Sequence, residues 1–223
     1  MRKLNSIIDR ISYFSFKKIK FEDLLEAENI YLYAGDVPRR KEYEKYIGLS
    51  LNQWNRRHIK HDVTKKYPLK DNCVNLFQSE DVFEHIYIEE IPAIINEIYR
   101  VLKPKGIFRL SLPDYGCDIF HQRTIRDEEG KFQFDPGGGG KFVDGKVVGG
   151  GHVWFPTYEI VKGILEKTDF KNINFLHYYN ELGEGITKNI DYSIAYVIRT
   201  PDHDARVQNP YRPMSIVVDC IKK

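Results

Sequence analysis

Cysteine is scarce in this sequence and is not arranged in pairs. The 223-residue chain has three cysteines, Cys73, Cys117 and Cys220, and no Cys-x-x-Cys among them. Zinc knuckles and disulfide frameworks need closely spaced pairs, so the sequence predicts neither. This cysteine usage fits a reducing compartment. We therefore expect a cytoplasmic location, which would be the host cytoplasm if the source is a virus.

Long apolar runs are lacking as well. No stretch approaches the roughly 20 apolar residues that a membrane-spanning helix requires, so no transmembrane segment is predicted. Residues 1–16 place Leu4, Ile7, Ile8 and Ile11 at helical spacing, with charges between them. We interpret this segment as an amphipathic helix that covers the domain, with attachment to a membrane surface as the alternative.

Charge of one sign is not concentrated anywhere. The chain has 34 Lys and Arg against 32 Asp and Glu, a net charge of +2, and its densest basic clusters at residues 17–20 and 39–41 are short. Nucleic-acid binding usually requires a concentrated basic face, so no nucleic-acid partner is predicted. Such clusters are typical of solvated surface, although either could steer an anionic substrate.

A full glycine-rich nucleotide fingerprint is missing. Residues 30–34, Ile-Tyr-Leu-Tyr-Ala, form an apolar strand-like run that is followed at once by Gly35 and Asp36. A glycine at a strand end lets a ligand approach the backbone, because glycine has no Cβ. Nucleotide fingerprints supply two or three glycines at this place, so the single glycine is by itself a weak signal.

The most informative stretch that is present runs over residues 72–85. Residues 74–77 form an apolar strand-like run, and the polar cluster Gln78, Ser79, Glu80 and Asp81 follows it. In open α/β sheets, ligands bind outside the carboxyl ends of the strands, so this cluster predicts a site. The alternative is a helix N-terminus that merely favours acidic residues.

Strands and helices alternate along the chain. A long amphipathic helix is predicted over residues 88–102 and a second helix over 158–167, with Thr157 as its N-cap. The predicted strands are 30–34, 46–51, 57–63, 74–77, 107–112, 173–177 and 216–221. This alternation is typical of a parallel sheet with covering helices.

One domain of residues 1–223 accounts for this length. We divide it into an N-terminal helical cover (1–28), a core (29–113), a glycine-rich excursion on the substrate side (114–157) and a carboxyl-terminal part (158–223). Gly140-Lys141 in the excursion is not a phosphate-binding loop, because Phe142 stands where the Ser or Thr would be.

Four motifs stand out along the chain: Leu32-Tyr33-Ala34-Gly35, Asp71-Asn72-Cys73-Val74-Asn75-Leu76, Glu84-His85 and Arg100-Val101-Leu102-Lys103-Pro104-Lys105-Gly106. They resemble those of class I S-adenosylmethionine-dependent methyltransferases of the type 11 group. Pro113-Asp114-Tyr115, Gly150-Gly151-His152 and Ile216-Val217-Val218-Asp219 resemble a subgroup associated with bacterial and viral surface-polysaccharide synthesis. The resemblance implies a Rossmann-like, seven-stranded, mostly parallel sheet whose last strand is antiparallel, with helices on both faces.

The same resemblance implies S-adenosylmethionine (SAM) as cofactor. The positions that it assigns to SAM are Tyr33, Ala34, Gly35, Ser50, Asn52, Asp62, Val63, Gln78 and Ser79. Asp62 would bind the adenine amino group, with Val63 against the ring. The sequence departs from the family in two places: Tyr33 replaces the first glycine, and Ser50 replaces the acid that binds the ribose hydroxyls. Serine cannot match the charge-assisted hydrogen bonds of a carboxylate, so we weigh substitution by Asn52, weak cofactor binding or lost activity.

The implied activity is methylation of a sugar hydroxyl on a glycan or its precursor, for example a deoxyhexose such as rhamnose. Such a hydroxyl is a weak nucleophile while protonated, so a positioned base is useful. His152 is the leading candidate because its usual pKa suits neutral pH, and Asp81 is the second. Asp114 would orient the histidine or hold a sugar hydroxyl. The structural alternatives are a histidine that only binds its own loop and, for Asp114, a helix N-cap.

Glu80, Tyr115, Trp154 and Arg206 are the predicted substrate-binding residues, with the aromatic rings as faces on which a sugar stacks, although such rings are more often core. Glu84 and His85 are assigned mainly to structure, in the helix after the strand. No residue is assigned to a metal, and Mg²⁺ is an option that we do not favour. The competing functions are methylation of another small molecule and a degenerate methyltransferase-fold binding module.

Overall fold

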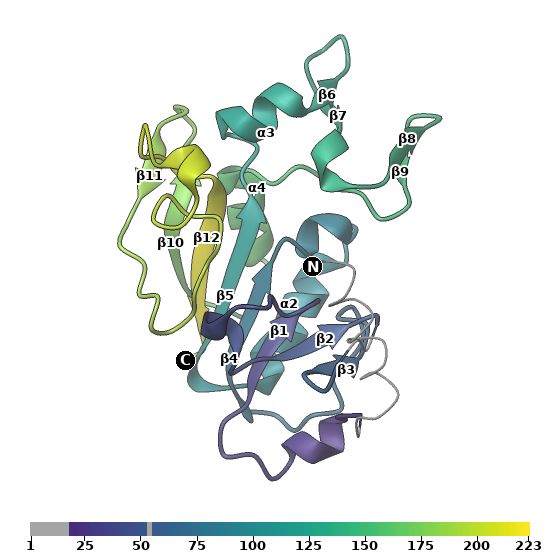
Figure 1. Ribbon diagram of the computed structural model, residues 1–223, viewed down its shortest axis with the longest axis vertical. Coiled ribbons are helices and arrows are strands. Elements are labelled where there is room, and N and C mark those ends of the chain that lie inside the picture. The colour runs from purple at the N-terminus through teal and green to yellow at the C-terminus, as the bar shows by residue number, and fades with distance from the viewer. Residues whose placement is uncertain (1–17, 53–54) are drawn as a thin grey trace, which may run out of the picture.

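The computed structural model describes residues 18–52 and 55–223. Within them, eight strands form one sheet in the order β11-β10-β12-β5-β4-β1-β2-β3 (Figure 1). The bounds are Tyr31–Ala34 (β1), Ile47–Ser50 (β2), His58–Lys60 (β3), Val74–Glu80 (β4), Leu102–Pro113 (β5), Asn172–Tyr179 (β10), Gly185–Thr187 (β11) and Ser215–Ile221 (β12).

The predicted Rossmann-like topology is confirmed. Strands β1 to β5 pair in parallel, and β12, the last strand, runs antiparallel between β5 and β10. The short strand β11 adds an eighth member at one edge. The clearest boundary error concerns β4, which continues through Gln78, Ser79 and Glu80, where the sequence predicted a polar cluster beyond the strand.

Two amphipathic helices cover one face of the sheet. Helix α2 (Ile91–Val101) buries Ile94, Ile95 and Ile98, and α4 (Tyr158–Leu165) buries Val161, Ile164 and Leu165. Helix α2 begins three residues later than predicted, with Pro92 in its first turn, where proline is tolerated. Thr157 is the N-cap residue of α4, as predicted, but its side chain makes no capping hydrogen bond.

The opposite face has a thinner cover. Tyr33 and Leu76 pack there against Tyr43 and Tyr46 of the β1–β2 connection and against Ala195. The connection contains only the 3-10 turn η2 (Lys41–Tyr43), because about a dozen residues between two strands leave little room for a longer helix. The sequence predicted helices on this face as well. In the described residues, 3-10 turns and the segment 190–198 cover it instead.

The remaining elements are short. Residues 21–28, predicted to be helical, form only the 3-10 turn η1 (Phe21–Leu24), and the helix predicted over residues 1–16 lies outside the described residues. The others are η3 (Phe83–His85), α3 (Asp118–Arg123), β6 (Ile125–Arg126), β7 (Phe132–Phe134), η4 (Pro136–Gly138), β8 (Lys141–Val143), β9 (Lys146–Val148) and η5 (Ala205–Val207). None of the described helices is long and apolar enough to cross a membrane.

The glycine-rich excursion forms two small hairpins, β6-β7 and β8-β9. Figure 1 shows that they and α3 stand beyond the carboxyl end of β5, on the side where ligands bind in open α/β sheets.

A buried arginine joins the antiparallel strand to the parallel sheet. Arg109 on β5 lies directly opposite Asp219 on β12. Its Nε and Nη2 donate to the two carboxylate oxygens of Asp219, each at 2.7 Å, and its Nη1 donates to the carbonyl oxygens of Asp191 and Ala195. One guanidinium therefore holds both β12 and the segment 190–198 on the sheet.

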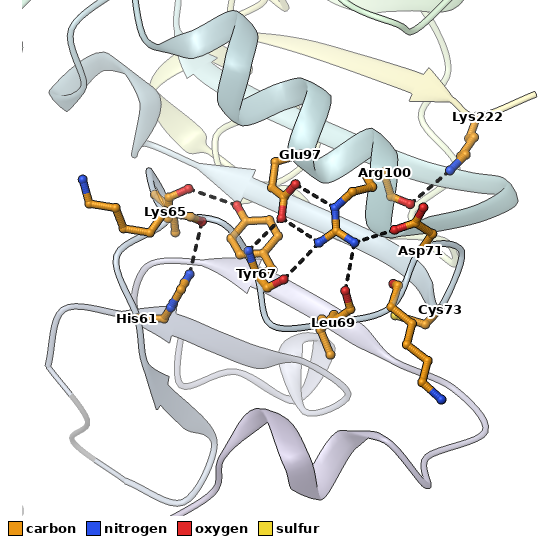
Figure 2. Close-up of polar contacts among 11 residues, drawn as sticks. His61, Lys65, Tyr67, Leu69, Asp71, Cys73, Glu97, Arg100 and Lys222 are labelled. Atoms are coloured by element: carbon orange, nitrogen blue, oxygen red, sulfur yellow. Dashed lines mark hydrogen bonds and ion pairs between the residues drawn. The ribbon is translucent and has the colours of Figure 1, made fainter.

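A second arginine shapes the connection between β3 and β4. Figure 2 shows Arg100 of α2 within hydrogen-bonding distance of the Glu97 and Asp71 carboxylates and of the Tyr67 and Leu69 carbonyl oxygens, at 2.6–2.9 Å. The arginine of the Arg-Val-Leu-Lys-Pro motif is thus a structural residue.

We expect the variant Arg109→Met to lose about 3–5 kcal/mol of unfolding free energy, because it leaves the Asp219 carboxylate buried without its partner. Guanidinium unfolding measures this. Arg206→Met is the matched control, since Arg206 forms an ion pair with Asp204 on the surface, and should cost at most about 1 kcal/mol. The double variant Arg109→Met/Asp219→Leu should recover part of the loss. Equal effects of Arg109→Met and Arg206→Met would contradict this role of Arg109.

Candidate functional site

A cavity of about 620 Å³ opens at the carboxyl ends of strands β1 to β4. Gly35 and Asp36 line it after β1, Ser50 and Asn52 at the end of β2, residues 61–65 after β3, and Asp81 after β4. The parallel register brings these strand ends to one edge, so segments far apart in sequence share one cavity.

Five of the predicted cofactor-binding residues line this cavity: Gly35, Ser50, Asn52, Asp62 and Val63. Gly35 has a φ of +83°, and a Cβ added there would lie 3.1 Å from Cγ2 of Val82. The left-handed backbone and the tight space both favour glycine at this turn.

The other four do not line it. Tyr33 and Ala34 belong to β1 and pack into the core on opposite faces of the sheet. Gln78 and Ser79 lie inside β4 and are fully buried, and Gln78 Nε2 donates to Glu80 Oε1 and to the Tyr196 carbonyl oxygen. Gln78 and Ser79 were predicted to follow the strand, but β4 continues through Glu80.

Asp36 is a lining residue that the sequence analysis did not select. Ser50 Oγ donates to Asp36 Oδ1 at 2.5 Å, so a carboxylate stands beside the serine that replaces the expected acid. The turn is held by the Val37 N–H, which donates to His58 Nε2 at 2.9 Å. The signal was available, since an acid directly follows the glycine of β1, but the partnership with Ser50 requires the parallel pairing of β1 and β2.

Residues 61–65 form another wall of the cavity. Asp62 Oδ1 accepts from the N–H and the hydroxyl of Thr64. Partial burial raises the pKa of Asp62, but these hydrogen bonds outweigh it and leave the pKa below its usual value. Two further hydrogen bonds hold this wall, as Figure 2 shows: the Tyr67 hydroxyl donates to the Val63 carbonyl oxygen, and His61 Nε2 contacts the Lys65 carbonyl oxygen.

Asp81 is the predicted catalytic residue that lines the cavity. It follows β4 with a φ of +54°, and Arg199 Nη1 lies 3.0 Å from its Oδ1. Burial raises the pKa of its carboxyl, against the opposing effect of Arg199. Asp81 is therefore a partly shielded carboxyl that faces the cavity.

The sequence predicted that His152 reaches into the cavity. In the structure it lies behind the cavity wall and does not line the cavity. Its ring is buried against His85, with ring centroids 4.8 Å apart, and its Nδ1 is 2.6 Å from the Tyr115 hydroxyl. A Cβ on Gly138 would fall 2.6 Å from the imidazole, so that glycine lets the loop pack on the ring. Burial lowers the pKa of His152 to about 4, which keeps the ring neutral at physiological pH.

Asp114, Tyr115 and Trp154 are part of the framework. Asp114 accepts hydrogen bonds from the N–H groups of Gly116 and Tyr179, which corrects the prediction that it orients His152. Tyr115 is buried and donates to Asp135 Oδ2 at 2.6 Å. Trp154 is buried too, and its Nε1 donates to the Phe83 carbonyl oxygen, so neither ring offers the sugar-stacking face that was predicted.

Glu80 and Arg206 also differ from their predicted substrate contacts. Glu80 points to the thinly covered face, where it accepts from the Tyr43 hydroxyl at 2.5 Å, from Gln78 and from the Ile198 N–H at 3.0 Å. Arg206 is paired with Asp204 at 2.6 Å. Strand alternation explains Glu80, because residues 78 and 80 of β4 point to the same face.

The described residues bring together one group of side chains that could hold a metal ion: Glu84, His85 and His152. Their ligand atoms lie within 4.8 Å of one another. The sequence analysis assigned Glu84 and His85 to a helix and no residue to a metal. They lie in the single 3-10 turn η3, and Val153 N–H docks the His152 loop on the Glu84 carbonyl oxygen at 2.9 Å.

The fold is that of the SAM-dependent methyltransferases. A SAM-dependent methyltransferase from Archaeoglobus fulgidus has a TM-score of 0.50 at 16% identity, over 100% of this chain and 95% of that chain. A SAM-dependent methyltransferase from Thermotoga maritima, described as a possible histamine N-methyltransferase, has a TM-score of 0.51 at 14% identity, over 97% and 92%. In sequence, residues 43–110 match the family described as "Methyltransferase domain". No curated protein matches the chain.

We expect the titration of Glu80 to make folding pH-dependent. Burial raises the pKa of Glu80 from 4.5 to about 7, so the folded protein binds a proton that the unfolded chain releases. The stabilisation relative to Glu80→Gln is therefore fully present below pH 4.5 and is lost as pH rises through 7, a change on the order of 3 kcal/mol.

Urea unfolding at several pH values from 4.5 to 8 checks this expectation. The stability difference between wild type and Glu80→Gln should shift in favour of Glu80→Gln as pH rises. Glu166→Gln, at an exposed position, is the control and should leave the pH profile unchanged. A constant difference between wild type and Glu80→Gln would show that Glu80 does not titrate in this range.

Proposed function

We propose that this chain is a SAM-dependent O-methyltransferase whose acceptor is a sugar hydroxyl of a glycan or its precursor. The observation that carries the proposal is the cavity at the carboxyl ends of β1 to β4, largely within the residues that match the methyltransferase domain. In a sheet of this kind, that edge is where a nucleoside-type ligand binds.

The residues of the cavity fit SAM. The Asp36 carboxylate beside Ser50 supplies a charged acceptor for the ribose hydroxyls at the place where the family acid is missing. Asp62 and Val63 offer an acceptor for the adenine amino group and an apolar contact for its ring, and Gly35 leaves room for close approach of the ligand. When bound, SAM supplies a methyl group activated on its sulfonium.

Asp81 is the residue best placed to serve as general base. It faces the cavity, while Asp114 is fully engaged and the His152 ring is buried behind His85. A carboxyl whose pKa is raised by burial is better matched to taking a proton from a hydroxyl near neutral pH. Its contact with Arg199 keeps the carboxylate oriented.

Two features support a sugar acceptor. One is the resemblance of residues 113–115, 150–152 and 216–219 to a subgroup associated with surface-polysaccharide synthesis, and the other is the excursion over residues 114–157. The excursion stands beyond the carboxyl end of β5, the strand next to β4 (Figure 1). Methylation of another small molecule is compatible with the same cavity, so the acceptor has to be identified by assay.

We expect SAM to bind and Asp36→Asn to weaken its binding by about 10- to 100-fold, because hydrogen bonds to a charged acceptor contribute about 1.5–3 kcal/mol. Isothermal titration calorimetry measures this. Asp169→Asn, an exposed change of the same kind away from the cavity, should bind like wild type. Failure of the wild-type chain to bind SAM would favour a degenerate binding module over an enzyme.

We expect Asp81→Asn to lower kcat by about 10²- to 10⁴-fold, the usual contribution of a general base. The assay follows the labelled methyl group from SAM onto a panel of defined glycosides and non-sugar alcohols and amines. SAM affinity is measured in parallel to separate binding from turnover. Unchanged kcat in Asp81→Asn would leave alignment of the acceptor as the mechanism, and methylation of non-sugar compounds alone would overturn the sugar assignment.

A further inference from the structure

Glu84 is a buried carboxylate without a partner. Its side chain is 0% exposed, and within the described residues neither carboxylate oxygen has a hydrogen-bond partner. The Nε2 atom of His152 lies 3.6 Å from its Oε1, too far for a hydrogen bond. Leaving a buried acidic group unsatisfied costs several kcal/mol, so its position calls for a ligand.

The tautomer of His152 follows from a chain of hydrogen bonds behind it. Asp135 Oδ2 accepts from Arg123 at 2.6 Å and from the Tyr115 hydroxyl at 2.6 Å. The Asp135 carboxylate is the acceptor in both of these hydrogen bonds. The Tyr115 hydroxyl has a single hydrogen, which it donates in the hydrogen bond to Asp135.

The Tyr115 hydroxyl must therefore accept from His152 Nδ1, which lies 2.6 Å away. With the proton on Nδ1, Nε2 carries the free lone pair, and Nε2 is the atom that faces Glu84. The Nε2 lone pair of His152 and the unpartnered carboxyl oxygens of Glu84 thus converge on one buried point.

We propose that Glu84, His85 and His152 bind a divalent transition-metal ion, with Zn²⁺ as the principal candidate. Two imidazoles and one carboxylate are a known Zn²⁺ ligand set, whereas Mg²⁺ prefers oxygen ligands and water. The chain Arg123–Asp135–Tyr115 acts on His152 as the outer hydrogen-bond partners of metal-binding histidines do.

The distances allow such a site after small movements. Ligand atoms on one Zn²⁺ are about 3.4 Å apart, from bond lengths of about 2.1 Å, against the 4.8 Å limit observed for the three residues. His85 is exposed and can turn to close the gap. Because His85 also lines the cavity, the metal would lie next to the cavity. Metal binding itself does not depend on the proposed function.

Zinc uptake by the full chain, prepared without a polyhistidine tag and stripped with EDTA, tests this site. Titration with ZnCl₂ in a calorimeter should give one ion per chain at micromolar affinity or tighter. Glu84→Gln and His152→Ala should each weaken uptake at least 10-fold, and Tyr115→Phe about 10- to 100-fold, because it removes the acceptor for Nδ1–H. His121→Asn, at an exposed histidine elsewhere, is the control and should bind like wild type.

Thermal melting keeps the test independent of both activity and misfolding. In EDTA, Glu84→Gln should melt at or above the wild-type temperature, because it removes a buried unpaired acid, yet zinc should raise only the wild-type melting temperature. No uptake of Zn²⁺, Co²⁺, Mn²⁺ or Fe²⁺ would overturn the proposal. Zinc uptake that Glu84→Gln and His152→Ala leave unchanged would overturn it equally, as would uptake of Mg²⁺ alone.

Discussion

The buried guanidinium of Arg109 is the interaction on which the rest of this structure depends. It fixes the antiparallel strand β12 through Asp219 and holds the segment 190–198 through two carbonyl oxygens. That segment then reaches β4, where the Ile198 N–H binds Glu80, and the next residue, Arg199, meets Asp81 at the cavity. A structural ion pair on one side of the sheet thereby determines the charge environment of the proposed base.

The polar residues at and just after the end of β4 have different roles although they are close in sequence. The alternation of β4 sends Gln78 and Glu80 to the thinly covered face, where Gln78 Nε2 donates to the Tyr196 carbonyl oxygen and Glu80 accepts from the Tyr43 hydroxyl. Asp81 leaves the strand with a positive φ and lines the cavity, and Glu84 follows in η3 with no partner. Acids that look equivalent in sequence thus become a structural anchor, a proposed base and a proposed metal ligand.

The cavity also shows how a site can keep its chemistry when one position changes. The acid expected at the end of β2 is Ser50, yet the Asp36 carboxylate from the β1 turn lies against its hydroxyl. Because β1 and β2 are parallel neighbours, a carboxylate from either strand end reaches the same place. The sequence left open substitution by Asn52, weak cofactor binding or lost activity, and the structure places the Asp36 carboxylate beside Ser50.

The sequence by itself determined where most strands and helices lie. Apolar runs with a period near two or 3.6 residues, and the glycines and prolines between them, predicted seven of the eight strands, both long helices and a glycine-rich excursion, because these patterns report local burial. The antiparallel last strand was implied by the family resemblance. The sequence also predicted Gly35, Ser50, Asn52, Asp62 and Asp81, which line the cavity because they follow or end strands.

Only the tertiary structure decided which polar side chains are already engaged in hydrogen bonds within the protein. Trp154, Tyr115 and Asp114 are taken up by buried hydrogen bonds to residues distant in sequence or across a turn, and Asp36, Glu84 and His152 gain their meaning from neighbours on other segments. Hydrophobic periodicity depends only on residues that are neighbours in sequence. The pairing of polar groups depends on how strand ends and loops meet in space.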